Sequence, residues 1–560
     1  MVVKIKVDIE KVLLVLFFSV ILFLGPGNLF DHKIKHDFPF GYGASDAFQH
    51  QVRAEAIKDM GNFRYEANYI SLGLENVVGR YPPVSYHLAV ILSYLSGMET
   101  YDTMYFLVTI FPILSSLVMY FIIRDYSKAV ALLSAPLSML IFSSPITIGF
   151  VWGHWPSILS QSFLIFFFWS IMRMDLDKSF IIIAIALSSI TLIHATATIF
   201  AIIFLILFFG IRFIFKGIKK QDIKAIMAAF AVSFLISFYY LVIFQNTWAK
   251  DQPYSFNAEP VSFGTPVLYI AGFGLLLLPI AIGIIFSVLK LKNLHISLIL
   301  AFAMLLIGFL NYVGFGFRSF QARFLWPIYL SAFLGLGLYI IFKFLIRKWN
   351  FVLTSSIFVI LVFLLSGIIK FPIIKQTDVQ AIPSIPYTDI TTNQGVMDKY
   401  HWEALKWISR NTENDALIYF FYGDIYSQDA LLRNAKRVHY QVWANEFVNS
   451  LQERRIKRHY YTELPGDSGG GLVTKESFFR FEKAGKSKPA EFFEGVHDIC
   501  KFDYYVFDKA SRQQALAQYN LLIASEMLKK DYVSMVFQNE VVFILKNDNP
   551  GADCVEERSF

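Results

Sequence analysis

Apolar segments separated by short polar or basic loops occupy the first two thirds of this 560-residue chain. A helix needs about 20 apolar residues to cross the hydrocarbon core of a bilayer, and most of these segments approach that length. The pattern therefore predicts a polytopic α-helical membrane protein with about eleven transmembrane helices. The expected spans are residues 12–24, 104–123, 128–143, 157–172, 179–194, 196–215, 225–244, 263–289, 295–312, 324–342 and 351–371.

Basic residues between the spans predict the orientation of the chain in the cell membrane. The basic loops are residues 124–128, 212–224, 290–292 and 343–348, and residues 173–178 are roughly neutral. Because cytoplasmic loops carry an excess of Lys and Arg, we expect all five on the cytoplasmic side. Residues 84–95 are too short to span and are predicted to be interfacial or re-entrant. Residues 30–103 then form the first outer loop, and the odd number of spans places the C-terminal tail outside.

The N-terminus fits two interpretations. Residues 1–11 are basic, residues 12–24 are apolar, and Gly25-Pro26-Gly27 follows. A cleaved signal peptide has this layout, but it also needs a small-x-small cleavage motif, which is not evident here. A retained membrane anchor is the favoured interpretation, and both place the following segment outside.

The composition changes near Phe371, where charge returns and apolar runs shorten to strand length. We expect residues 1–371 to form the transmembrane domain and residues 372–560 a soluble, extracytoplasmic mixed α/β domain of ordinary size. Its expected elements are helices at 400–411 and 511–530, a strand at 416–421, and a hairpin of 532–538 with 541–546.

Charge and cysteine content narrow the partners and the compartment. Residues 372–560 carry 23 Lys+Arg and 26 Asp+Glu, so the net charge of +7 leaves about +10 on the membrane part. Basic residues in short loops suit anionic lipid headgroups, and we expect no nucleic-acid partner. The two cysteines, Cys500 and Cys554, can form a disulfide if the tail is outside, but two free thiols fit equally well.

Asp46 is the first acidic residue of the outer loop, in the segment GYGASDAFQH. A carboxylate facing outward beside the membrane can act as a general base on an acceptor. The alternative is structural, because Asp46 and Gln49 have the spacing of a capping box for a helix over residues 47–60. Glu55 and Glu75 are weak candidates for a divalent metal such as Mg²⁺ or Mn²⁺.

Arginines near the predicted outer surface are candidates for binding phosphate. Arg80 precedes Tyr81-Pro82-Pro83, and Arg318 and Arg323 lie in the segment NYVGFGFRSFQAR. A guanidinium binds phosphate in a two-pronged geometry that suits a lipid phosphate or diphosphate. The alternative is that these side chains extend to the headgroup region without a specific ligand.

His87, His154 and His194 are all expected near the outer leaflet. They come from different segments without the spacing of metal ligands, so a metal site is disfavoured. Hydrogen bonding to a phosphate or sugar and plain structural packing remain open for each. The sequence GDSGGG at residues 466–471 resembles a protease nucleophile loop, but the strands and the histidine that this chemistry needs are missing. No phosphate-binding loop of the nucleotide type is present.

Together these features resemble the GT-C superfamily of membrane glycosyltransferases. Asp46 in GASDAFQH and Arg80–Pro83 followed by VSYHLAVILSYLSG are similar to the protein O-mannosyltransferase and aminoarabinose-transferase branch. The segment HWEALKWISRNTENDALIYFFYGD is similar to the start of the soluble domain of oligosaccharyltransferase catalytic subunits. Two departures matter: FFYGD stands where oligosaccharyltransferases have WWDYG, and Asp46-Ala47 stands where O-mannosyltransferases have paired acids.

The resemblance implies a glycosyltransferase that moves a sugar from a polyprenyl-phosphate or polyprenyl-diphosphate donor to an acceptor on the outer face. The acceptor is a glycan, a lipid or a protein. Asp46 would be the general base, and Arg80, Arg318 and Arg323 would bind the lipid phosphate. The other substrate-binding residues would be Tyr81, His87, His154 and His194, of which His154 and His194 would shape the site. The alternative is a flippase for lipid-linked sugars or another transporter. Transporters often carry polar, interrupted helices at mid-membrane depth, which this pattern disfavours.

Overall fold

In the computed structural model the chain forms two compact units. Unit 1 consists of Met1–Ile34, Met104–Tyr240 and Tyr254–Asn393, and unit 2 of Lys35–Thr103, Leu241–Pro253 and Gln394–Phe560. The first predicted outer loop thus belongs to the same unit as the C-terminal domain. The residues described are 8–25, 37–43, 45–71, 77, 79, 81–143, 149–174, 178–251, 266–314, 319–346, 348–366, 396–421, 423, 429–441, 455–457, 496–509 and 514–555.

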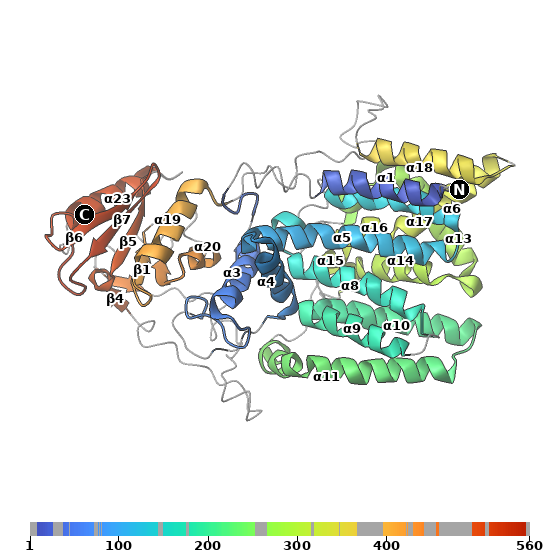
Figure 1. Cartoon of the computed structure of the whole chain (residues 1–560), viewed down its shortest axis with the longest axis horizontal. Coiled ribbons are helices and arrows are strands. Elements are labelled where there is room, and N and C mark those ends of the chain that lie inside the picture. Colours follow the sequence, from blue (N-terminus) through green and yellow to red (C-terminus); the bar gives the residue numbers. More distant parts are fainter. Residues whose placement is uncertain are drawn as a thin grey trace, which may run out of the picture. The chain divides into compact units, whose positions relative to one another are not determined.

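Unit 1 is helical, and every predicted span overlaps one or more of its apolar helices (Figure 1). By length and composition, four helical stretches in the described part of the chain can cross a membrane: 100–124, 195–215, 220–244 and 319–345. The other apolar helices are shorter, so the number of spans stays a prediction. The helices are α1 (Ile9–Leu24), α5 (Thr100–Arg124), α6 (Lys128–Ser134), η1 (Ala135–Phe142), α8 (Trp155–Ile171), α9 (Ser179–Ile193), α10 (Ala195–Phe215), α11 (Lys220–Asp251), α12 (Pro266–Ala271), α13 (Leu277–Leu289), α14 (Ile296–Ile307), α15 (Ser319–Ala322), α16 (Trp326–Tyr329), α17 (Ser331–Leu345) and α18 (Phe351–Leu365).

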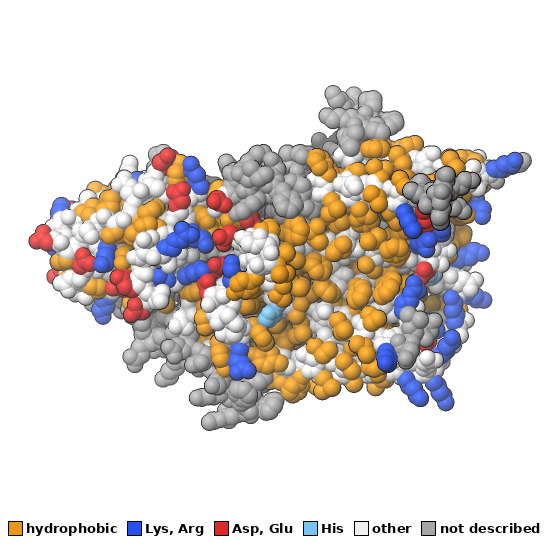
Figure 2. Space-filling view, viewed as in Figure 1, with side chains coloured by type: hydrophobic (Ala, Val, Ile, Leu, Met, Phe, Trp, Pro, Cys, Tyr) orange, Lys and Arg blue, Asp and Glu red, His pale blue; other side chains and the backbone are white. Residues whose placement is uncertain are grey.

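The outer surface of this helical unit is apolar along most of its length, and Lys and Arg gather at one end (Figure 2). Leu235, Ile206 and Met227 are 73%, 66% and 65% exposed. Apolar surface this extensive on a soluble protein would be costly, and a bilayer is the solvent that suits it. The surface therefore supports the membrane assignment independently of the segment lengths.

Contacts between helix ends bring three of the five predicted cytoplasmic loops together. Arg173 Nη1 lies 3.0 Å from Asp125 Oδ2, and the ring of Tyr126 lies 5.6 Å from that of His295. These pairs join the loops after α5, α8 and α13 at one end of the unit. An alternating path of the helices requires this arrangement, so the geometry agrees with the topology predicted from the loop charges.

Helix α1 is built into unit 1. Glu10 is 4% exposed and accepts a hydrogen bond from the Tyr120 hydroxyl at 2.6 Å, and it pairs with Arg124 and Lys128. Phe17 is fully buried and packs against Phe358 of α18. Helix α1 thus packs into unit 1 through both charged and aromatic contacts.

Glycines allow α17 to lie close to its neighbours. A Cβ at Gly337 would come 1.8 Å from the carbonyl oxygen of Pro279 in α13, and one at Gly335 would come 2.0 Å from Ser134 Oγ. On the α13 side, a Cβ at Gly283 would meet the carbonyl oxygen of Phe333 at 2.1 Å. Small residues let the backbones approach, and the resulting close packing is what holds helices together in lipid.

Unit 2 combines helices of the first outer loop with a mixed α/β domain. Its principal sheet has the strand order β2-β1-β5-β7-β6. Strands β2, β1 and β5 run parallel to one another, and β7 is antiparallel to both of its neighbours, β5 and β6. The predicted strand at 416–421, both tail helices and the hairpin are confirmed, with ends shifted by a few residues. The elements are α3 (Ser45–Met60), α4 (Val84–Ser96), α19 (Lys399–Asn411), β1 (Leu417–Phe420), α20 (Asp429–Leu432), η6 (Arg433–Ala435), β2 (Val438–Gln441), β3 (Arg455–Lys457), β4 (Val496–Asp498), β5 (Tyr504–Asp508), α23 (Gln514–Met527), β6 (Val533–Gln538) and β7 (Val542–Asn547).

Helices cover both faces of this sheet. Alternate residues of paired strands point to one face, where Tyr419, Tyr505 and Leu545 share a core with Ile523 and Met527 of α23. Helix α19 covers the opposite face. Its strong amphipathic pattern, with Trp402, Leu405 and Ile408 buried, is what the sequence predicted for that segment.

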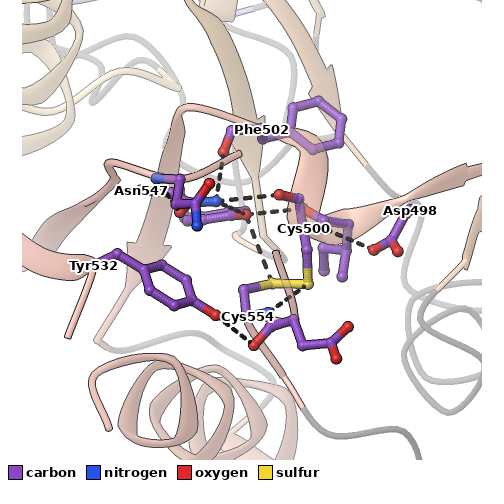
Figure 3. The surroundings of a disulfide bond; sticks show 10 residues. Asp498, Cys500, Phe502, Tyr532, Asn547 and Cys554 are labelled. Atoms are coloured by element: carbon purple, nitrogen blue, oxygen red, sulfur yellow. Dashed lines mark hydrogen bonds between the residues drawn. A yellow bond between two sulfur atoms is a disulfide. The ribbon is translucent and has the colours of Figure 1, made fainter. Parts of the chain in front are cut away.

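A disulfide joins Cys500 to Cys554 with an S–S distance of 2.02 Å (Figure 3). The bond closes a loop of 54 residues and ties the chain end after β7 to the segment before β5. Asn547 Nδ2 donates to the Cys500 carbonyl at 3.1 Å, and the Cys554 sulfur lies 3.7 Å from the Tyr505 hydroxyl. Of the two alternatives that the sequence left open, the structure supports the paired cysteines.

His401 lies between two carboxylates on the α19 side of the sheet. Its Nδ1 is 2.6 Å from Asp398 Oδ2, and its Nε2 is 3.1 Å from both oxygens of Asp508. Burial by itself would lower the pKa of His401, but the bonds to Asp398 and Asp508 outweigh it and raise the pKa from 6.5 to about 10. The protonated imidazole is therefore part of the folded structure at neutral pH.

We expect the stability of unit 2 to fall as the pH rises from 6.5 toward 10. The folded state binds the His401 proton more tightly than the unfolded state, so this contribution is complete below pH 6.5 and lost on passing the folded pKa near 10. Thermal unfolding of the full chain at a series of pH values checks this. The His401→Gln variant should lose this part of the pH dependence, and an identical pH profile for both proteins would contradict the assignment.

Candidate active-site elements

Asp46, the predicted base, lies on an exposed position in the first turn of α3. The helix begins at Ser45, so Asp46 is inside the helix and not at the capping position expected from the sequence. Gln49 Oε1 is buried and has no hydrogen-bond partner among the described residues, so the predicted capping box does not form. The N-terminal turn of a helix favours negative charge, which suits an ionised carboxylate there.

The buried face of α3 packs against the segment that leads into α4. The guanidinium of Arg53 lies 4.4 Å from the ring centre of Tyr81 and within 3.8 Å of Glu66 Oε1. His50 Nδ1 is 2.8 Å from the Tyr86 hydroxyl. Tyr81, a predicted substrate-binding residue, is thus half-buried beside the guanidinium of Arg53. His50 and Arg53 were not among the residues predicted from the sequence. They lie four and seven residues after Asp46, a spacing that places all three on one side of a helix.

Glu55, a weak metal candidate, is occupied by protein partners. Its Oε1 is 2.8 Å from Lys436 Nζ, and its Oε2 accepts from Thr100 Oγ1 at 2.7 Å. Burial alone would raise the pKa of Glu55, but Lys436 and Thr100 outweigh it and lower the pKa. Within the described ranges, no group of three His, Cys, Asp or Glu side chains is placed to hold a metal ion. Both carboxylate oxygens of Glu55 are thus engaged in structural contacts.

His87 lies on α4, and its ring packs edge-on against Phe63 at 4.7 Å. Burial lowers the pKa of His87, so the neutral ring is favoured. Packing therefore accounts for the contacts of His87 in this structure. Four predicted features lie outside the described residues: Glu75, Arg80, Arg318 and the glycine loop 466–471.

In unit 1, Arg323 is fully buried. Its Nε donates to the Gly308 carbonyl at 2.8 Å, and its Nη2 donates to Asn311 Oδ1 at 2.5 Å. An arginine that extends to the headgroup region must be exposed, so that alternative for Arg323 is wrong. The guanidinium instead lies inside unit 1, where it donates to the Gly308 carbonyl and the Asn311 side-chain oxygen.

His154 joins the same region. It precedes α8, and its ring stacks on Phe324 at 5.3 Å and meets Phe320 edge-on at 5.5 Å, on either side of Arg323 in the chain. His194 lies at the junction of α9 and α10, which the helix directions place at the end opposite the basic loops. His154 thus packs against the segment of unit 1 that carries Arg323.

A glutamine pair beside Arg323 was missed by sequence reasoning. Gln161 Nε2 donates to the Gln321 carbonyl at 2.7 Å, and both residues are at most 1% exposed. The Oε1 atoms of Gln161 and Gln321 have no hydrogen-bond partner among the described residues. The sequence did carry a signal, because a polar residue inside an apolar segment marks an internal or functional position.

Comparison with known proteins places this fold. No protein-family model matches the chain, and no curated protein matches it in sequence. Solved structures do match over most of its length, and they are GT-C membrane glycosyltransferases. The chain therefore has the fold of GT-C membrane glycosyltransferases, as the sequence resemblance predicted.

Three solved structures show the extent of the likeness. The oligosaccharyltransferase AglB of Archaeoglobus fulgidus, in complex with an inhibitory peptide and a dolichol-phosphate, matches 89% of this chain and 69% of its own, with a TM-score of 0.55 and 14% identity. ArnT of Cupriavidus metallidurans, bound to undecaprenyl phosphate, matches 97% and 99%, with a TM-score of 0.51 and 10% identity. The arabinofuranosyltransferase AftD from Mycobacteria matches 97% of this chain and 40% of its own, with a TM-score of 0.53 and 12% identity. At such identities the likeness shows the fold alone.

Proposed function

We propose that this protein transfers a sugar from a polyprenyl-phosphate or polyprenyl-diphosphate donor to an acceptor on the outer face of the membrane. The observation that carries the proposal is the match of nearly the whole chain to ArnT, whose structure contains undecaprenyl phosphate. AglB, in complex with dolichol-phosphate, adds a second match with a lipid phosphate. The acceptor is a glycan, a lipid or a protein.

In the proposed reaction Asp46 is the general base. It takes the proton of an acceptor hydroxyl or amine as that atom bonds to the anomeric carbon of the sugar. The bond between this carbon and the lipid-phosphate oxygen breaks, and the electron pair leaves with the phosphate. The phosphate leaving group already activates the donor, so the reaction needs no nucleotide.

Negative charge grows on the departing lipid phosphate, and fixed cations would stabilise it. Arg323 is the described candidate, and its burial supports this role because charge interactions strengthen away from water. Arg80 and Arg318 are further candidates. His154, packed beside Phe320 and Phe324, together with His194, would shape the donor site. The proposal assigns no step to a metal ion, since Glu55 is engaged by Lys436 and Thr100.

The disulfide supports placing unit 2 outside the cytoplasm. Disulfides such as Cys500–Cys554 persist in oxidising compartments and are rare in the cytosol. The gathering of Lys and Arg at one end of unit 1 supports the same orientation through the positive-inside rule.

Transfer by the purified protein tests the proposal. The full chain is reconstituted in vesicles with a polyprenyl-phosphate-linked sugar, and release of the free lipid phosphate is measured with and without candidate acceptors. We expect the donor to be consumed with one lipid phosphate released for each sugar moved. Movement of intact donor between leaflets without consumption would overturn the proposal and identify a transporter instead.

A further inference from the structure

A lysine of the C-terminal domain reaches the helix that carries Asp46. Lys436 follows η6, and its Nζ lies 2.8 Å from Glu55 Oε1 and 2.7 Å from Asp59 Oδ2, both on α3. Lys436 has a backbone φ of 54°, in the left-handed region that is uncommon for residues other than glycine. The chain thus turns sharply at the residue whose side chain bridges to α3.

The ion-paired groups are held by further contacts in unit 2. Thr100 Oγ1 donates to the second oxygen of Glu55, and the Tyr69 hydroxyl donates to Asp59 Oδ2 at 2.9 Å. Glu55 is 7% exposed, and the side chain of Lys436 is 21% exposed. Asp59 is exposed, so only the pair with Glu55 lies largely away from water. Removing Lys436 leaves the buried charge of Glu55 uncompensated.

This attachment lies on the same rigid element as the proposed base. Asp46 and Glu55 are nine residues apart on α3, about 13.5 Å along a helix that rises 1.5 Å per residue. A helix transmits a change in its direction to its far end. The position of the first turn of α3 therefore depends on the contact that Lys436 makes at residues 55 and 59.

We propose that Lys436 is a positioning residue for Asp46, holding α3 to the C-terminal domain through Glu55 and Asp59. The inference rests on the proposed role of Asp46 as the base. It gives the C-terminal domain a part in the reaction that does not require it to contact the donor.

The test compares Lys436→Met with Lys436→Arg and with Lys529→Met in the full-length protein. Lys529→Met is the matched control, because it removes an exposed ion pair with Glu526 elsewhere in unit 2. Hydrogen exchange at the backbone amides of residues 49–52, which donate to the carbonyls of residues 45–48 in a helix that begins at Ser45, reports the order of the first turn. The values of kcat and KM are measured for transfer. A double variant, Glu55→Gln with Lys436→Met, removes both charges and serves if the single variant does not fold.

We expect faster exchange at residues 49–52 in Lys436→Met. Its kcat should be about tenfold lower, with KM for the donor little changed, since misplacing a catalytic group by about 1 Å can cost about 10²-fold. Lys436→Arg should restore most of the activity, and Lys529→Met should behave as wild type. Wild-type exchange and kcat in folded Lys436→Met would overturn the inference.

Failure of the proposed function gives a different result. If Asp46→Asn transfers sugar normally, the base assignment fails whatever Lys436→Met does. If Asp46→Asn is inactive while folded Lys436→Met keeps its kcat, only the positioning role fails. The exchange measurement needs no activity, so it decides the structural step in every case.

Discussion

Asp46→Asn is expected to lower the rate of sugar transfer by about 10²- to 10⁴-fold, the range that a positioned general base contributes. The asparagine amide has nearly the shape of the carboxylate but cannot accept the acceptor's proton. Because Asp46 is exposed on the first turn of α3, the substitution should leave the fold intact. Initial rates of donor consumption in vesicles, at equal amounts of folded protein, give the measurement.

The matched control is Asp531→Asn, which removes an exposed acid elsewhere in unit 2. This variant should transfer sugar at the wild-type rate. Binding of the donor lipid should survive in Asp46→Asn, because the proposed phosphate contacts come from arginines. Near wild-type transfer by Asp46→Asn would remove the base from the proposed mechanism.

Replacing both Cys500 and Cys554 by serine is expected to lower the free energy of unfolding of unit 2 by about 4 kcal/mol. This value follows from the chain-entropy model for a loop of this length, in which the bond restricts the unfolded chain. The two sites are buried in the core shared by α23 and the sheet, so the loss falls on the stability of the whole sheet. Denaturant unfolding of wild type and variant, without reductant, measures the difference.

Reduction of the wild-type protein should reproduce the effect of the double substitution and leave the variant unchanged. The same bond also tests the orientation of the chain. In intact cells both thiols should resist alkylation until a reductant is added. Free thiols in the native cell, or equal stabilities of the two proteins, would contradict the disulfide and remove its support for an outer location.

Local pattern in the sequence predicted the apolar helices and several tail elements, although strands β2 and β5 of the principal sheet were missed. Apolar runs of membrane length mark helices because the bilayer forces the backbone to satisfy its hydrogen bonds internally. The amphipathic period of α19, and the two strand-like runs on either side of Asn539-Glu540 in the hairpin of β6 and β7, likewise indicate their own structure. The gathering of the basic loops at one end also follows from the sequence, because the charges alternate with the spans.

Contacts between residues far apart in the chain could not be predicted from the sequence. Nothing in the pattern around Glu55 indicated that it would form an ion pair with Lys436, 381 positions later. Nor did the sequence show that Asp46 would lie inside α3 instead of at its capping position. Arg323 was predicted near the outer surface, either as a phosphate-binding residue or extended to the headgroups, and the sequence did not show that packing buries it against Gly308 and Asn311. The pairing of Cys500 with Cys554 was left open for the same reason.

The sequence by itself determined that this chain is a many-helix membrane protein with a mixed α/β tail, since periodicity and segment length are local properties. Only the tertiary structure decided that the first outer loop and the tail form one unit, and which carboxylates are engaged there. The physical reason is that a side chain's partner depends on how the elements pack, and the energy of that packing is summed over the whole unit.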